Sequence, residues 1–180
     1  MIGTSRGGGA GRRFPGPATE GIIAGSVCPV AVAPRGYARQ AVAATREVLV
    51  AFDGSHEATA ALAHAAALAA EASARLSVIN VVRSPSRSSV SLVGSALAEV
   101  GATAAVEIAG GDPASEIVAR TARVDLLVMG SRGRGAIRRP ALGTVVSQVV
   151  RDAASPVLVL PQSAVLEGAG RAFETTAGTR

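Results

Sequence analysis

The chain has 180 residues, a net charge of +5, a hydrophobic content of 48% and an aromatic content of 2%. This length suits one domain with extra segments, and a core with so few aromatic side chains must be built from Ala, Val, Leu and Ile, which favours regular α/β layers. All 18 basic residues are arginine. Several lie in a Gly-rich stretch and no aromatic platform accompanies the others, so we do not expect a nucleic-acid-binding protein.

The residue content also fits a reducing, aqueous compartment. A single cysteine, Cys28, excludes an internal disulfide and a cysteine-based zinc site. No apolar run reaches the length of a transmembrane helix, and residues 1–13 lack the apolar core of a signal peptide. His56 and His64 lie eight positions apart without a third ligand, so no metal site is expected. We therefore expect a soluble, cytoplasmic protein.

The first 45 residues contain a short internal repeat. Residues 1–21 are rich in Gly, Pro, Arg and Ser without apolar periodicity, which predicts a disordered tail. Within residues 22–45, the sequence CPVAVAP echoes SPVLVLP near the end of the chain. This repeat predicts a strand at Val30–Ala33, which we expect to add to the exposed edge at Val157–Leu160. A linker should follow at Gly36–Thr45.

The pattern becomes regular from Arg46. The apolar run Val48–Phe52 predicts a central strand in a parallel sheet. Ser55 is expected to cap an Ala-rich helix that continues through Ala72, and Leu76–Val82 predicts a second strand. A strand, a helix and a strand without a hairpin turn make a βαβ unit with a right-handed crossover.

A serine-rich loop is expected to follow the second strand and to precede a short helix near Leu92–Val100. Ala102–Ile108 predicts the third strand. Asp112 at the N-cap and Pro113 at the first helical position predict another helix, to about Ala122.

The closing third of the domain begins with the apolar strand Asp125–Met129, which ends in the glycine-rich loop Gly130–Gly135. A helix should begin at Gly143-Thr144. The last strand, Pro156–Leu160, starts with proline, which is typical of a sheet edge.

A strand, a glycine-rich loop and a helix N-terminus in this order can hold phosphate, because backbone N–H groups and the helix dipole face the anion. The chain contains no lysine, which excludes a Walker loop, and Asp53-Gly54-Ser55 after the first strand does not fit the dinucleotide fingerprint. The ligand crevice of such a sheet lies between the first and fourth strands, where Asp53 would face Met129–Gly133. The alternative is that Asp53 only starts a helix and that the glycines only make turns.

The spacing of Gly130, Gly133 and Gly143-Thr144 resembles the G-x2-G-x9-G-(S/T) motif of the ATP-binding branch of the universal stress protein family. The segments VLVAFDGSHEA, GDPASEIV and SPVLVLP resemble other parts of that family, in the same order, over about Arg46–Pro161. The resemblance implies a Rossmann-like, doubly wound α/β sheet of five parallel strands in the order 3-2-1-4-5, with helices on both faces. It also implies frequent dimerisation through the fifth strand.

The resemblance further implies an ATP site, alone or with Mg²⁺, at the carboxyl edge of the sheet. The adenosine side would be lined by Ala51, Phe52, Asp53 and Val81, and Met129 and Gly130 would lie under the nucleotide. The phosphates would be held by Gly133, Gly143, Thr144 and Val145, and Arg132 is a nearby positive charge. Where many relatives carry a hydroxyl two positions after the glycine, this chain has Val146, so one phosphate contact is missing.

We therefore expect a nucleotide-binding regulator of the stress response. No residue is a convincing catalytic base or nucleophile, so the protein is not expected to be an enzyme, and any ATP hydrolysis should be slow. The alternative is a nucleotide-free dimerisation or interaction module of the same fold; a small-molecule transferase lacks a candidate motif.

The expected organisation is a family domain at residues 46–162 and a flexible tail at 163–180. Residues 22–45 resemble the last strand of a preceding tandem domain, which would reflect truncation or a mispredicted start. The partner of the fifth strand is then either a second chain, in a homodimer, or residues 30–33 of the same chain, in a pseudo-dimer.

Overall fold

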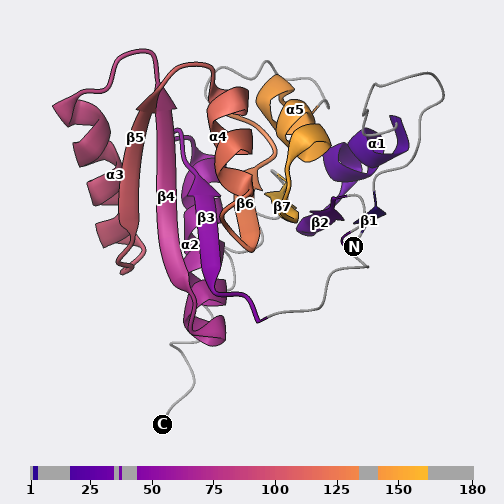
Figure 1. Ribbon diagram of the computed structural model, residues 1–180, viewed down its shortest axis with the longest axis horizontal. Coiled ribbons are helices and arrows are strands. Elements are labelled where there is room, and N and C mark those ends of the chain that lie inside the picture. The colour runs from indigo at the N-terminus through magenta and orange to yellow at the C-terminus, as the bar shows by residue number, and fades with distance from the viewer. Residues whose placement is uncertain (1, 4–16, 35–36, 38–43, 134–141, 162–180) are drawn as a thin grey trace, which may run out of the picture.

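A computed structural model describes residues 2–3, 17–34, 37, 44–133 and 142–161 of the chain, which combine strands and helices throughout (Figure 1). The strands are β1 (Ile2–Gly3), β2 (Val30–Ala33), β3 (Glu47–Ala51), β4 (Arg75–Val82), β5 (Ala105–Gly110), β6 (Leu126–Gly130) and β7 (Val157–Leu160). The helices are α1 (Pro17–Gly25), α2 (His56–Ala72), α3 (Arg87–Glu99), α4 (Pro113–Thr121) and α5 (Thr144–Asp152).

The sheet is mixed and has seven strands in the order β1-β2-β7-β6-β3-β4-β5. Five neighbouring strands are parallel, in the order β7, β6, β3, β4 and β5. In contrast, β2 pairs with β7 in the antiparallel direction. The expectation of a sheet of five parallel strands in the order 3-2-1-4-5 is therefore wrong for the sheet as a whole. The physical reason is that the outer edge of β7 offers unpaired backbone groups, and β2 satisfies them.

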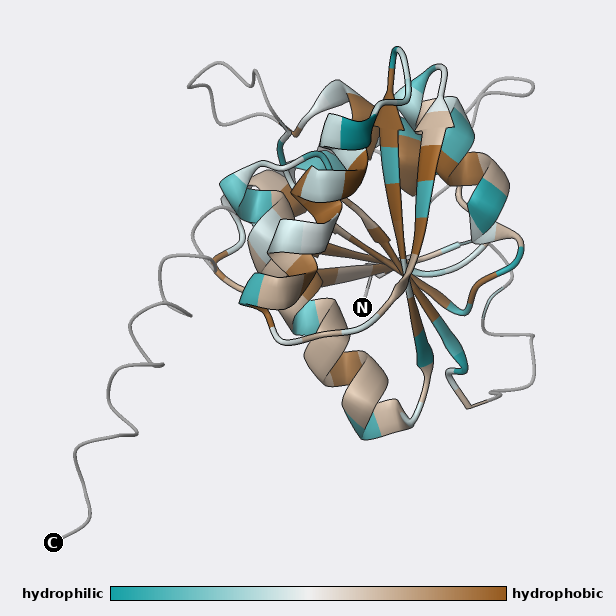
Figure 2. Ribbon diagram, turned by 90° about the vertical axis from the view of Figure 1, so that its left-hand side faces the viewer, coloured by the Kyte–Doolittle hydropathy of each residue, from teal (hydrophilic) through white to brown (hydrophobic). Residues whose placement is uncertain are grey.

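Helices cover both faces of the sheet, which is the doubly wound α/β arrangement that the sequence predicted (Figure 1). Buried residues of α1, α4 and α5 form one hydrophobic cluster with one face of the strands. Buried residues of α2 and α3 form a second cluster with the other face. Figure 2 shows mostly hydrophobic strands between helices that carry both hydrophobic and hydrophilic residues. The central strands are apolar on both faces for this reason.

Side-chain caps fix the starts of α2 and α4. Ser55 caps α2 by accepting a hydrogen bond from the backbone N–H of Ala58, and α2 ends at Ala72, as predicted. Asp112 caps α4 in the same way, with proline at the start of the helix. Both predicted caps are confirmed.

Two boundaries differ from the prediction. The serine-rich segment is not a loop up to Leu92, because Ser86 accepts a hydrogen bond from the backbone N–H of Ser89 and starts α3 at Arg87. The strand expected from Ala102 begins only at β5, because the backbone N–H of Ala102 donates to the carbonyl of Leu97 and still belongs to the end of α3.

The predicted pairing of the N-terminal strand with the edge of the last strand is confirmed. Val30 lies opposite Val159 and Val32 opposite Val157 in an antiparallel register. The inference from Pro156 that the last strand lies at an edge is wrong, since β7 lies between β6 and β2. The carbonyl of Pro156 accepts a hydrogen bond from the backbone N–H of Leu127, a contact for which proline needs no N–H.

The N-terminal elements repeat the closing third of the chain in order and in register. Adding 127 to the residue numbers of α1 and β2 gives the bounds of α5 and β7. The same shift converts the parallel pair of Ile2 with Val32 into the pair of Met129 with Val159, which joins β6 and β7. The repeat is therefore a whole strand–helix–strand unit, although the sequences are plainly similar only around β2 and β7.

The remaining predictions fall largely outside the described residues. These include most of the disordered tail at 1–21, most of the linker, the end of the glycine-rich loop and the tail at 163–180. The prediction of disorder is wrong for two described parts of 1–21, because residues 2–3 form β1 and residues 17–21 belong to α1. Ile23 of α1 is fully buried in the hydrophobic cluster, and this apolar contact holds the helix on the sheet.

Candidate functional site

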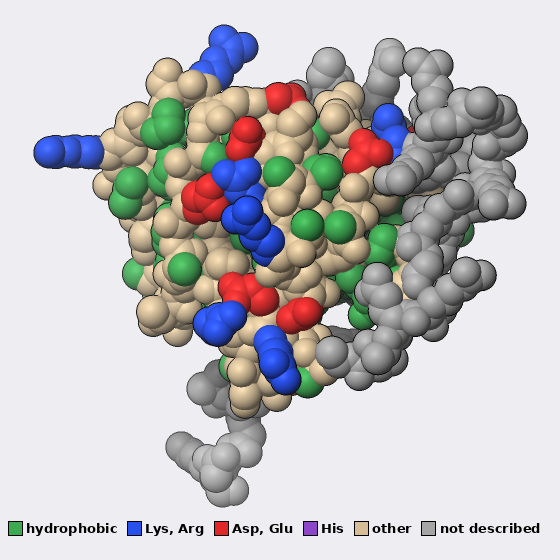
Figure 3. All heavy atoms as spheres, viewed as in Figure 1, with side chains coloured by type: hydrophobic (Ala, Val, Ile, Leu, Met, Phe, Trp, Pro, Cys, Tyr) green, Lys and Arg blue, Asp and Glu red, His purple; other side chains and the backbone are tan. Residues whose placement is uncertain are grey.

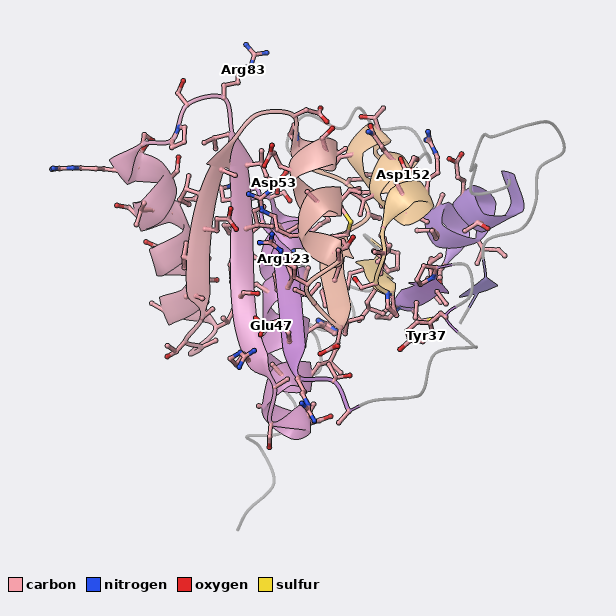
Figure 4. All side chains as sticks on the ribbon, in the orientation of Figure 1. Tyr37, Glu47, Asp53, Arg83, Arg123 and Asp152 are labelled. Atoms are coloured by element: carbon pink, nitrogen blue, oxygen red, sulfur yellow. The ribbon has the colours of Figure 1, made fainter. Side chains whose placement is uncertain are left out.

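A cleft of about 950 Å³ lies at the carboxyl edge of the sheet. The ends of β3, β4 and β6 contribute to it, as do residues at the starts of α3, α4 and α5. Figure 4 shows Asp53 and Arg83 near this edge and Glu47 at the opposite end of β3. All eleven residues that the sequence predicted line the cleft: Ala51, Phe52, Asp53, Val81, Met129, Gly130, Arg132, Gly133, Gly143, Thr144 and Val145.

Asp53 and Gly133 bring the two sides of the cleft together. Oδ1 of Asp53 accepts a hydrogen bond from the backbone N–H of Ser55 at 2.9 Å, which fixes the turn between β3 and α2. A methyl group added at Gly133 would lie 2.6 Å from Oδ2 of Asp53. The carboxylate thus occupies the space that a side chain at position 133 would need, and the predicted approach of the first strand to the glycine-rich loop is present.

Gly130 has a structural role that the motif alone did not reveal. A methyl group here would lie 2.8 Å from Cβ of Glu57 and 3.1 Å from its carbonyl carbon. The end of β6 therefore packs directly against the first turn of α2, and glycine is required by this close approach. Gly130 lines the cleft, but its lack of a side chain is explained by packing without any ligand.

The N-terminus of α5 provides the backbone donors of the site. Gly143 occupies the N-cap with φ −62° and makes no side-chain capping bond. Its own N–H donates to the carbonyl of Ser131 at 3.1 Å, which ties the helix start to the end of β6. Thr144 and Val145 follow in the first turn and line the cleft. A helix start without a side-chain cap leaves backbone N–H groups and the positive end of the dipole for an anion.

Val146 also lines the cleft but is 3% exposed and belongs to the hydrophobic cluster of α5. Position 146 therefore carries an apolar side chain that packs inward. The phosphate contacts available from this turn are therefore those of the backbone and of Thr144.

The cleft includes residues that the sequence prediction missed, among them Asn80, Ser88, Ser89 and Leu92. Ser88 and Ser89 lie in the first turn of α3, where a loop is expected from the sequence, and Leu92 follows in the next turn, within the predicted helix. Asn80 is an amide within the otherwise apolar second half of β4, and it is 2% exposed. A polar residue in the middle of such a run was a signal that could have identified it.

A larger hollow of about 1300 Å³ lies along α2 and the end of α3. Its lining consists largely of alanine, and Glu47 and Glu99 contribute carboxylates. His56, His64 and Arg75 also line this hollow, and Arg75 is paired with Glu47.

Two arginines outside the cleft, Arg75 and Arg120, are engaged with carboxylates, and Figure 3 shows both signs of charge close together across one face. Arg120 donates to Glu107 and, at 2.6 Å, to Glu116. The hydrogen bond from Arg120 holds the pKa of Glu107 below its usual value. Arg75 donates to Glu47 at 2.7 Å. The basic residues therefore do not form a uniformly positive surface over this part of the chain.

The sequence profile of the universal stress protein family matches residues 44–100 and 92–161. The chain belongs to the universal stress protein family. A universal stress protein of Methanocaldococcus jannaschii is 31% identical over 138 residues, which are 64% of this chain and 81% of that protein.

Solved structures agree with this assignment. A universal stress protein from Archaeoglobus fulgidus superposes with a TM-score of 0.59 at 24% identity, over 78% of this chain and 52% of that chain. This chain thus spans about half the length of that relative. A universal stress protein in complex with cAMP superposes with a TM-score of 0.56 at 28% identity, over 67% of this chain and all of that one, 100%. Within the part of the chain that is described, no helix is both long and apolar enough to cross a membrane.

Proposed function

We propose that this chain is a cytoplasmic, nucleotide-binding regulator of the stress response that holds ATP in the cleft at the carboxyl edge of the sheet. One observation carries the proposal: the apolar ends of β3 and β4 and the uncapped start of α5 open onto a single cleft. An apolar surface suits a nucleobase, and backbone donors at a helix start suit phosphates. The relative solved with cAMP supports the proposal, because cAMP shares an adenosine and a phosphate with ATP.

The same cleft does not favour fast chemistry. Asp53 is the one carboxylate among the described residues that line it, and one of its oxygens is held by the turn to Ser55. A general base needs a free position beside the attacking water. We therefore propose that ATP acts as a ligand that shifts conformation or partner binding, with hydrolysis slow at most.

Thr144→Glu is expected to weaken ATP binding while sparing the fold. Thr144 is exposed at the first position of α5, where a carboxylate is favourable to the helix dipole but repels phosphates. With ATP at about 100 times its Kd, the melting temperature of the unaltered protein should rise by roughly 5–10 °C. Thr144→Glu should lose most of this rise, as measured by calorimetry.

Thr144→Gln is the matched control, because it has the size of the glutamate without its charge. It loses the Thr144 hydroxyl but adds no negative charge, so its ATP-dependent rise in melting temperature should fall less than that of Thr144→Glu. An equal loss in both variants would mean that bulk rather than charge is responsible, and an undiminished rise in Thr144→Glu would contradict phosphate binding at α5.

A nucleotide-free interaction module is the second candidate, and the inward-packed Val146 favours it, because one phosphate contact is absent. It predicts that ATP leaves the melting temperature of the unaltered protein unchanged. The same calorimetric experiment therefore separates the two functions.

We also propose that residues 2–33 are the closing part of a second unit of the same fold. The repeat of α5 and β7 by α1 and β2 supports this. In this proposal the antiparallel pairing of β2 with β7 takes the place of a contact between two chains, giving a pseudo-dimer in which β2 occupies the outer edge of β7. Val149 of α5 is fully buried, whereas Ile22, its counterpart in α1, is 48% exposed. Among the residues that the structure describes, nothing covers this face of α1 as α4 covers α5.

A further inference from the structure

The pairing of β2 with β7 has the symmetry of a contact between two identical strands. In the repeat, Val30 and Val32 are the counterparts of Val157 and Val159. When two identical strands pair in the antiparallel direction about a two-fold axis, the middle residue faces its own copy and each flanking residue faces the copy of the other. The register of β2 and β7 meets this condition: Val30 lies opposite Val159, Ala31 opposite Leu158, and Val32 opposite Val157.

The same symmetry includes the neighbouring strands. The sheet order β1-β2-β7-β6 reads the same from either end when β1 and β2 are taken as the counterparts of β6 and β7. β1 pairs with β2 in the parallel direction, as β6 does with β7. A contact with two-fold symmetry is self-complementary, so the surface on one side of it also fits a second copy of that surface. The outer edge of β7 therefore fits β7 of a second chain as well as β2.

β2 covers an edge that is unfavourable to expose. Val157 and Val159 are 1% and 0% exposed, and they share a hydrophobic cluster with Val30 and Val32 of β2. Without β2, a run of apolar residues with unpaired backbone groups would form the edge of the sheet, which is a template for another strand. A pair of β7 strands would retain both valine–valine pairs, and Leu158 would face its own copy instead of an alanine.

The covalent connection favours β2 over a second copy. Residues 34–46 join β2 to β3, so β2 competes for the edge at an effective concentration on the order of millimolar. Separate chains at micromolar concentration cannot match this. The intact chain should therefore keep its own β2 on the edge.

We propose that β2 is an intramolecular block on self-association, and that the outer edge of β7 docks β7 of a second copy of this chain, in the same antiparallel register, when β2 leaves it. This inference rests on the proposed second unit at residues 2–33 and is independent of nucleotide binding. It makes the N-terminal unit the element that decides between a monomer and a two-fold dimer.

Val32→Asp on the full chain tests the block without altering β7. Val32 is 2% exposed, and a carboxylate cannot be buried among valines without a large cost, so β2 should leave the edge. In sedimentation equilibrium at micromolar concentration, the unaltered chain should have the mass of one chain and the variant twice that mass. Val27→Asp is the matched control, because it adds the same charge outside β2, at a side chain that is 65% exposed. It should remain a monomer.

The outcomes separate this inference from the proposed pseudo-dimer. A folded Val32→Asp variant that stays monomeric would overturn the inference and leave the pseudo-dimer standing, whereas an unaltered chain that is already dimeric would overturn both. Equal dimerisation of the two aspartate variants would show that charge rather than release of β2 is responsible. Assemblies larger than a dimer would also contradict the inference, because a two-fold contact closes at two chains.

A protease site inserted within residues 38–43 provides the second test if Val32→Asp does not fold. Cleavage leaves every strand unaltered but removes the covalent connection of β2 to β3, so the advantage of β2 in effective concentration is lost. In size-exclusion chromatography, the part that carries β7 should separate from the N-terminal part as a dimer. A cleaved chain whose two parts stay together, or a folded monomer of the part that carries β7, would overturn the inference.

Discussion

Gly130→Ala is expected to destabilise the protein by about 1–3 kcal/mol, because overpacking a close contact forces neighbouring elements apart. The added methyl group would lie 2.8 Å from Cβ and 3.1 Å from the carbonyl carbon of Glu57. Backbone and Cβ atoms cannot rotate away, so β6 and α2 must separate. Urea unfolding followed by circular dichroism measures the effect, since the chain has no tryptophan.

Gly143→Ala is the matched control. A methyl group at Gly143 meets no atom closer than 3.4 Å, and φ is −62°. Its effect on the free energy of unfolding should stay within about 1 kcal/mol, because alanine adopts this conformation without strain. Equal effects of the two substitutions would show that β6 does not pack on α2 as closely as described.

Val149→Ala is expected to cost about 2 kcal/mol, and Ile22→Ala much less, although the two residues occupy equivalent places in the repeat. Val149 is fully buried in the cluster that contains Ala114 and Ile117 of α4. Ile22 is 48% exposed, so truncating it removes little buried area. The same unfolding experiment compares them.

This pair also tests the proposal that α1 belongs to a second unit of the same fold. A large cost for Ile22→Ala would mean that its side chain is covered in solution. That result would contradict an open face on α1 and would call for a packing partner already present in the protein.

Sequence reasoning located most elements because local chemistry specifies them. Ser55 and Asp112 were identified as caps, since each precedes a helix-forming run and its side chain accepts a backbone N–H. It failed at Ser86, where several serines in succession offered more than one cap and were taken as a loop. It also missed α1, because that helix is stabilised by Ile23 packing on the sheet rather than by its own composition.

The site was predicted from the order of strand, glycine loop and helix, and the predicted residues line one cleft. Roles within the site were harder to predict, because they depend on contacts between segments distant in sequence. Gly130 is required by Glu57, more than seventy positions earlier. Nδ2 of Asn80 in β4 donates a hydrogen bond to the carbonyl of Phe52, which follows β3. Neither contact can be predicted from the spacing of residues in a motif.

The most direct test of the central claim is to map ATP binding on the full chain by the amide resonances of isotope-labelled protein. We expect shifts at the end of β3, at Gly133, and at Thr144 and Val145, with no change along the exposed face of α2 at Ala63 and Ala67. Shifts confined to α2, or none at saturating ATP, would contradict a nucleotide site at the carboxyl edge of the sheet.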